Sequence, residues 1–153
     1  MTSKNSFVDG TYTAGKPEYS NVIKEILSRG VCPFCPENFS WHKKPLLGED
    51  GNWIVTENSW PYKNARYHFL LICTVHKTDV AELTIEDFVS LHNLVSGVRE
   101  RFEISGGALT LRFGDSRFTG ATVAHLHFHL IVPSLFKSGK KKGRARPVWF
   151  PVG

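Results

Sequence analysis

The stretch Gly120-Ala-Thr-Val-Ala-His-Leu-His-Phe-His-Leu-Ile-Val-Pro133 alternates histidine with apolar side chains. In a β-strand, successive side chains point to opposite faces of the sheet. A strand over 125–132 therefore places His125, His127 and His129 on one face and sends the apolar residues between them into a core. Three imidazoles in a row are costly to bury without partners, so the pattern indicates a functional site.

A second motif, Cys32-Pro-Phe-Cys35, supplies two thiols at the spacing of a zinc knuckle, and a tetrahedral site needs two further ligands. The chain has three cysteines, an odd number that argues against a disulfide framework. Two interpretations of the histidine row stay open on this basis. Neighbouring histidines can bind one catalytic metal together, or they can divide into a structural group, a nucleophile and a positioning group.

The hydrophobic pattern around these motifs predicts two helices. The first begins at Pro17 and stops at Gly30. The second is the longer one; it begins after Thr84, which can cap it, and ends at 105–107. Its apolar positions form one stripe: Phe88, Leu91, Val95, Val98 and Phe102.

Five strands and a loop complete the prediction. The strands are expected at 53–55, 68–73, 108–113, 125–132 and, as an edge strand, 148–152, with a loop at 114–120. We predict an α+β fold, an antiparallel β-sheet with the long helix and the shorter N-terminal helix packed on one face. Residues 1–16 are predicted to form a flexible N-terminal arm, and residues 17–153 a single domain.

Positive charge is concentrated in one segment, 137–146. Its six basic residues come without an acid, and the remaining 13 Lys and Arg nearly balance the 14 Asp and Glu of the chain. Such a segment suits a phosphate-bearing ligand or a nucleic acid, and a solvated loop has the same composition. No apolar run approaches the ~18–20 residues of a membrane span, and the N-terminus lacks the apolar core of a signal peptide. We expect a cytoplasmic protein without a membrane partner.

The run His-Leu-His-Phe-His-Leu-Ile at 125–131 resembles the signature of the histidine-triad superfamily, in particular its zinc-binding branch of dinucleoside polyphosphate hydrolases and phosphorylases. The resemblance extends over about 31–133. It implies a structural Zn²⁺ in a closed site with no open position. The ligands implied are Cys32, Cys35, His76 and His125, with His42 and His68 as candidates only if His76 does not serve.

The resemblance also implies an enzyme with His127 as its nucleophile. A neutral imidazole can attack the α-phosphorus of a nucleotide and form a nucleotidyl-histidine intermediate that an acceptor then resolves. His129 is expected to orient the ring or contact the phosphate. The activity implied is a nucleotidyl hydrolase or transferase that cleaves a 5′-phosphoanhydride, phosphoramidate or similar bond. The alternatives are a nucleotide- or nucleic-acid-binding module with little turnover, and a hydrolase with a catalytic zinc on the triad.

Charge on the phosphoryl oxygens requires preorganised donors, and the loop 114–120 is the expected source. An ordinary hairpin turn is the alternative interpretation of this loop. Many relatives carry Asn or Gln at position 114 and Gln at position 121, where this chain has Gly114 and Ala121. A homodimer through the helix 84–102 is a further expectation from the resemblance. The residues expected to bind nucleotide or phosphate are Asn58, Ser116, Arg117, Thr119, Gly120 and Thr122.

Overall fold

An antiparallel β-sheet forms the centre of the computed structural model, which describes residues 6–11 and 16–153. Its five strands lie in the order β1-β2-β3-β5-β4. Strand β3 lies in the middle and pairs with β5, which places His127 opposite Ile72 and His129 opposite Leu70. The strands are β1 (Leu46–Asp50), β2 (Trp53–Glu57), β3 (Ala65–Cys73), β4 (Ala108–Leu111) and β5 (His127–Pro133).

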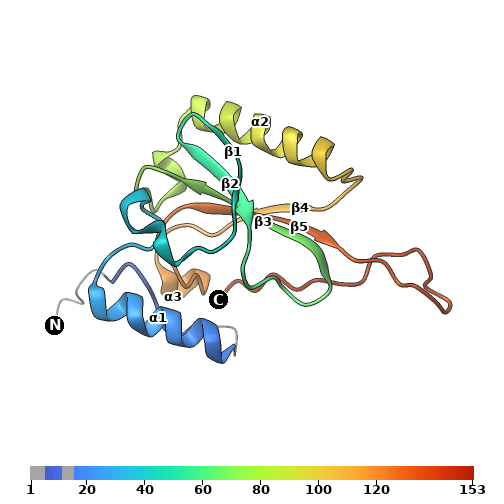
Figure 1. The fold of residues 1–153 in the computed structure, drawn as a ribbon, viewed down its shortest axis with the longest axis horizontal. Helices are drawn as coiled ribbons and strands as arrows, with labels where there is room; N and C mark the ends of the chain where they lie inside the picture. Colours follow the sequence, from blue (N-terminus) through green and yellow to red (C-terminus); the bar gives the residue numbers. More distant parts are fainter. Residues whose placement is uncertain (1–5, 12–15) are drawn as a thin grey trace.

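The two faces of the sheet carry different helices (Figure 1). The long helix α2 (Ile85–Arg101) packs Leu91, Leu94 and Val98 against the apolar face, where Phe128 and Leu130 of β5 are buried. Helix α1 (Pro17–Arg29) lies on the other side, facing the histidines of β5 across a pocket. The α+β fold with an antiparallel sheet is confirmed, whereas the expectation that both helices cover one face is wrong. Alternation along β3 and β5 leaves a half-polar second face, and Ile23 and Ile26 of α1 lie across the pocket from it.

The ends of both helices follow from local sequence. Thr84 caps α2 by accepting the backbone N–H of Asp87, whose carboxylate accepts the backbone N–H of Thr84 in return. Gly30 ends α1 in the left-handed conformation with φ of 64°. The buried stripe of α2 differs from the predicted one, since Leu94 is buried and Phe88 is half exposed.

Several boundaries differ from the predicted elements. Strand β5 begins at His127, so His125 lies in the bend that precedes it. The expected edge strand at 148–152 is absent, because these residues run beside the sheet without ladder pairing. The loop at 114–120 contains a helical turn, α3 (Ser116–Thr119), and strand β1 was not predicted. Two 3₁₀ helices, η1 (Pro36–Trp41) and η2 (Val80–Glu82), complete the described elements.

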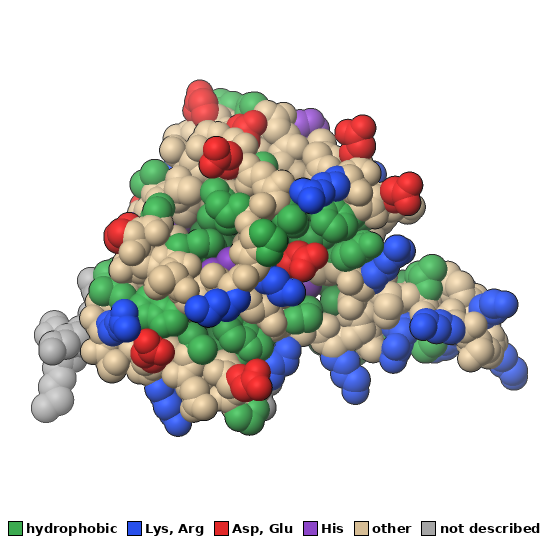
Figure 2. Space-filling view, in the orientation of Figure 1, with side chains coloured by type: hydrophobic (Ala, Val, Ile, Leu, Met, Phe, Trp, Pro, Cys, Tyr) green, Lys and Arg blue, Asp and Glu red, His purple; other side chains and the backbone are tan. Residues whose placement is uncertain are grey.

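Two peripheral segments bear on the predictions. Residues 6–11, part of the expected flexible arm, lie against the body, because Val8 is buried and pairs with Val123; the arm's positions 1–5 and 12–15 fall outside the described residues. The second peripheral segment is the basic one, 137–146. It belongs to an exposed hairpin that is closed by the bridge between Leu135 and Ala145. Lys and Arg side chains gather on this projecting hairpin (Figure 2). Within the described parts of the chain, no helix is long and apolar enough to cross a membrane.

Candidate active site and metal-binding cluster

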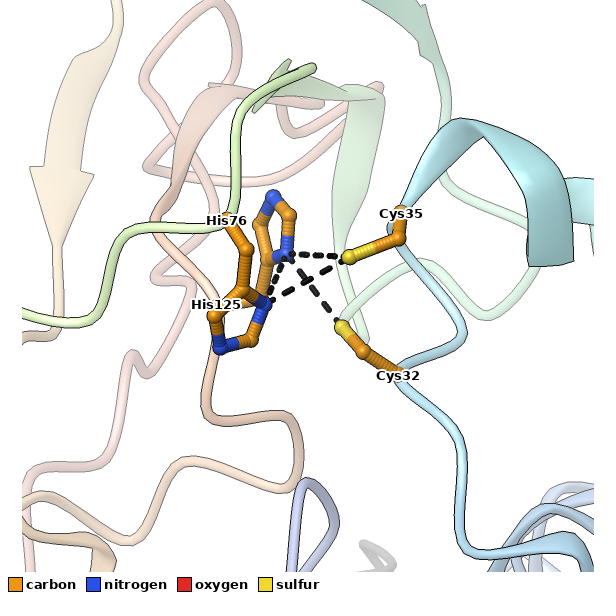
Figure 3. A group of neighbouring side chains, drawn as sticks. All are labelled: Cys32, Cys35, His76 and His125. Atoms are coloured by element: carbon orange, nitrogen blue, oxygen red, sulfur yellow. Dashed lines mark hydrogen bonds between the residues drawn. The ribbon is translucent and has the colours of Figure 1, made fainter.

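Four side chains from three separate segments converge beside one end of the sheet (Figure 3). Cys32 and Cys35 lie in the turn between α1 and η1, His76 follows β3, and His125 precedes β5. The Nδ1 atoms of His76 and His125 are 3.1 Å apart. The Sγ of Cys32 lies 3.3 Å from Nδ1 of His125, and the Sγ of Cys35 lies 3.5 Å from Nδ1 of His76. The structure thus brings together all four residues expected as metal ligands.

This arrangement fits a tetrahedral zinc ion. Zn–S bonds of about 2.3 Å and Zn–N bonds of about 2.0 Å give a tetrahedron with edges of about 3.3 to 3.8 Å. The Nε2–H of His125 donates to the backbone carbonyl of Cys73 at 2.6 Å, which leaves Nδ1 free of a proton and directed at the cluster. Burial and the neighbouring Cys32 raise the pKa of the Cys35 thiol to about 12, so a bound cation is needed to ionise it near neutral pH.

His127 stands at the start of β5 and lines a pocket of about 370 Å³ between the sheet, α1 and η1. Its Nδ1–H donates to the carbonyl of His125 at 2.7 Å. A neutral imidazole carries one N–H, so Nε2 is left with its lone pair, and no described residue bonds to it. Burial lowers the pKa of His127 to about 4, which keeps the ring neutral at pH 7.

A second imidazole, His68 of β3, fixes the tautomer of His129. The backbone N–H of Tyr62 donates to Nδ1 of His68 at 3.2 Å, so the proton of His68 is on Nε2. That Nε2–H donates to Nδ1 of His129 at 2.9 Å. His129 therefore carries its own proton on Nε2, which is buried and has no partner among the described residues. The pair presents one N–H donor beside His127, whose ring centre is 4.9 Å from that of His129.

The residues expected to bind phosphate divide into two groups. Asn58, Gly120 and Thr122 line the pocket with His127. Asn58 also places its side-chain amide 3.3 Å from Nε2 of His68 and accepts the backbone N–H of Trp60.

The other three of these residues bond to other protein groups and do not line this pocket. The hydroxyl of Ser116 donates to Asp9 at 2.9 Å, and the exposed Arg117 pairs with Asp115, to which its Nε donates at 2.9 Å. The Oγ1 of Thr119 accepts the backbone N–H of Ala121 at 3.2 Å. Their role in phosphate binding stays a prediction that the structure does not support.

Two polar residues of the site are not predicted from the sequence: Arg112, which lines the pocket, and His68, which does not line it but bonds to His129. The sequence indicates His68 only as a substitute metal ligand for His76, and it gives no role to Arg112. His68 could have been found from the alternation of β3, which places it on the same face as Leu70. Aromatic side chains of the segment after Cys32 also enter the pocket, namely Phe34, Phe39 and Trp41.

Comparison with known families settles the relationship of the chain. The family described as "Scavenger mRNA decapping enzyme C-term binding" matches residues 32–144, a segment that contains the four clustered cysteines and histidines and both pocket histidines of β5. The chain belongs to this family of the histidine-triad superfamily. A comparison with curated proteins finds no match.

Solved structures of histidine-triad proteins share the fold. A histidine-triad (HIT) family hydrolase from Clostridium thermocellum is 26% identical, with a TM-score of 0.55 over 71% of this chain and 95% of that chain. A histidine triad nucleotide-binding protein from Candida albicans is 18% identical, with a TM-score of 0.58 over 80% of this chain and 85% of the other. A zinc-bound histidine triad family protein from Mycobacterium smegmatis is 22% identical, with a TM-score of 0.50 over 76% of this chain and 83% of the other.

Proposed function

We propose that this histidine-triad protein is a nucleotidyl hydrolase or transferase that works through a covalent bond between the substrate phosphorus and His127. One observation carries the proposal. The Nδ1–H of His127 is held by the carbonyl of His125, which leaves Nε2 as the nucleophile of a ring that lines the pocket. The hydrolase from Clostridium thermocellum and the nucleotide-binding protein from Candida albicans support the reaction and substrate class.

The reaction takes two displacements at phosphorus. In the first, the lone pair of Nε2 of His127 forms a P–N bond to the α-phosphorus, and the bond to the leaving group breaks with its electron pair on the leaving group. A phosphate leaving group departs as an anion and requires no protein acid, whereas the amine of a phosphoramidate leaves after its nitrogen has taken a proton from solvent. In the second, water attacks phosphorus, the P–N bond returns its electrons to Nε2, and the surplus proton of water passes to solvent. A different acceptor in place of water makes the protein a transferase.

His129 is the group best placed to assist at the phosphoryl oxygens. Its Nε2–H has no partner among the residues that the structure describes and lies beside His127 in the pocket. An unpaired donor in a water-poor pocket stabilises an anion more strongly than the same donor in water. His68 acts through His129 by holding its tautomer, so we regard His68 as a positioning residue.

We propose a structural Zn²⁺ held by Cys32, Cys35, His76 and His125, where it would tie three segments together and add to the free energy of folding. The zinc-bound protein from Mycobacterium smegmatis supports this cofactor. The Nδ1 of His125 faces the cluster, and the backbone carbonyl of the same residue accepts the hydrogen bond from Nδ1–H of His127. A metal ion that fixes the position of His125 would therefore also fix the orientation of the His127 ring.

A binding module with little turnover is the second candidate. Gly114 and Ala121 provide no side-chain amide where many relatives have one, and the basic hairpin offers cations to a nucleic acid. A catalytic zinc on the triad finds less support, because Nδ1 of His127 is engaged by a backbone carbonyl and His125 points to the cysteines.

Trapping the intermediate tests the proposal. The protein is mixed with adenylated and guanylated phosphoanhydrides and phosphoramidates, quenched within milliseconds to seconds, and analysed as intact protein and as peptides by mass spectrometry. We expect a mass increase of one nucleotidyl group on the peptide that contains His127, and no adduct with His127→Ala. The exposed His92→Ala variant is the matched control and should form the adduct as the unaltered protein does. Binding of nucleotide without any adduct or product favours the binding module.

We also propose a homodimer through α2. Ile85, Phe88 and Val89 are 79%, 51% and 54% exposed and follow the i, i+3, i+4 spacing of one helix side. An exposed apolar patch of this kind suits a second subunit. The cytoplasmic location stays a prediction.

A further inference from the structure

Arg112 places a guanidinium in the pocket that contains His127 and His129. We propose that Arg112 binds the phosphate of the substrate beside the nucleophile, an inference that rests on the proposed function. Of the described side chains that line this pocket, Lys16 and Arg112 are the cationic ones apart from histidine, and none is an aspartate or glutamate. The charge of the pocket therefore suits an anion.

The register of the sheet explains how Arg112 reaches the site. Thr110 of β4 lies opposite His129 of β5, so both side chains are on the pocket face. Arg112 follows Thr110 by two residues, and alternation returns it to the same face just beyond the end of the strand. The guanidinium of Arg112 therefore extends from the end of β4 into the pocket that contains His127 and His129.

The contacts of Arg112 leave its charge uncompensated. Its Nε donates to the carbonyl of Pro151 at 2.9 Å, and its Nη2 donates to the hydroxyl of Tyr62 at 3.2 Å. The guanidinium carbon lies 4.0 Å from the centre of the Phe150 ring. Among the described residues no carboxylate pairs with Arg112, and no hydrogen bond uses Nη1.

Such a group is suited to phosphate. A guanidinium presents parallel N–H donors that match two phosphate oxygens, and its charge is permanent at the pH of the reaction. The neighbouring histidines are neutral at pH 7, because burial lowers the pKa values of His68 and His127 to about 4. Arg112 is then, with Lys16, a fixed positive charge of the pocket, a part that the exposed and ion-paired Arg117 does not fill.

A purely structural role for Arg112 is the competing explanation. The segment 147–153 packs Phe150 on both Arg112 and His129, with 5.1 Å between the ring centres of Phe150 and His129. Arg112 can anchor this segment without meeting a ligand. The two roles differ in what they predict for the affinity of a phosphate group compared with the affinity of the nucleoside that carries it.

The test measures binding of adenosine 5′-monophosphate, guanosine 5′-monophosphate and the two nucleosides by titration calorimetry. The full-length protein is compared with Arg112→Gln, Phe150→Ala and Arg99→Gln, the last an exposed arginine of α2 outside the pocket. We expect the unaltered protein to prefer the monophosphate. Arg112→Gln should reduce this preference by about ten- to a hundredfold, the worth of hydrogen bonds to a charged group, and leave nucleoside affinity unchanged. Arg99→Gln and Phe150→Ala should keep the preference.

Three outcomes overturn the inference. The unaltered protein can fail to prefer the monophosphate, Arg112→Gln can keep the preference, or Phe150→Ala can abolish it as fully as Arg112→Gln. Loss of the preference in Arg117→Gln instead would return phosphate binding to the residue expected from the sequence. The proposed function is judged separately by the adduct on His127, so an adduct together with an unchanged preference in Arg112→Gln refutes the inference alone.

Discussion

Two groups of histidines lie next to each other in this protein, and both lie in or directly beside the same two strands. The cluster group, His76 and His125, lies beyond the end of β3 and before the start of β5. The pocket group, His68, His127 and His129, lies within those strands. Because β3 and β5 are antiparallel, the end of one meets the start of the other, and each strand contributes to each group.

Burial does not distinguish His125 of the cluster group from His127 of the pocket group, although His76 is exposed. It lowers the pKa values of His125 and His127 alike to about 4, so both rings are neutral at pH 7. Their hydrogen-bond partners differ instead. In the cluster group the Nδ1 atoms converge on two sulfurs, whereas in the pocket group every bonded nitrogen meets a carbonyl, a backbone amide or another imidazole. The role of a histidine in this fold is thus set by which nitrogen its neighbours occupy.

The substitution expected to have the largest effect on one group alone is His76→Ala, in the cluster group. This change removes one ligand of a closed site, so we expect loss of zinc and a fall in melting temperature on the order of 10 °C, since metal binding contributes directly to folding. Metal content is measured by atomic emission and stability by calorimetry. Cys73→Ala is the matched control, since Cys73 is buried outside the cluster and should retain zinc. Full zinc and normal stability in His76→Ala would show that the ligand set is misassigned.

Local patterns were sufficient for the parts of this fold that depend on near neighbours. Alternation around His127 predicted β5, and Thr84 predicted the start of α2 through its capping interaction. The four cluster residues were expected from the resemblance, and the structure brings them together. The placement of α1 opposite α2 and the path of 147–153 depend on packing between distant segments, which local patterns do not encode.

The pocket was less predictable for the same reason. The hydroxyl and guanidinium groups of Ser116 and Arg117 suit phosphate by type, yet Asp9 and Asp115 occupy them. Arg112 could be assigned to the pocket only from the pairing of β4 with β5, which a single sequence does not give.

A smaller effect, confined to the pocket group, is expected from His68→Ala. Without the N–H of His68, His129 loses its fixed tautomer, and misplacement of such a group costs up to about 100-fold in rate. We expect kcat to fall by about 10- to 100-fold with little change in KM or zinc content. His68→Gln should restore part of the rate, because its amide N–H can donate to Nδ1 of His129.

An equal effect of His68→Ala on kcat and on KM would contradict this prediction. If His68→Ala raises KM as much as it lowers kcat, or if His68→Gln restores nothing while its melting temperature is normal, the residue supports the fold without positioning His129. His92→Ala provides the reference for substitution of an exposed histidine.

The smallest effect is expected from Asp87→Asn. Asp87 contacts neither group of histidines, but it binds Lys77 in the loop that contains His76 of the cluster group. Asp87 accepts hydrogen bonds from Lys77 at 2.6 Å and from Trp53 at 2.9 Å, and Lys77 is the neighbour of His76. Burial alone would raise the pKa of Asp87, but these donors and the backbone N–H of Thr84 lower it to about 2. Because the pKa is lower in the folded state than in the unfolded state, the stabilisation is present above about pH 4 and is lost as the pH falls towards about 2. Urea unfolding of both proteins should show a difference of about 2 kcal/mol at pH 7 that shrinks between pH 4 and pH 2. A difference that stays constant over this range would mean that the charge of Asp87 contributes nothing, and that the loop carrying His76 is held by the shape of its neighbours.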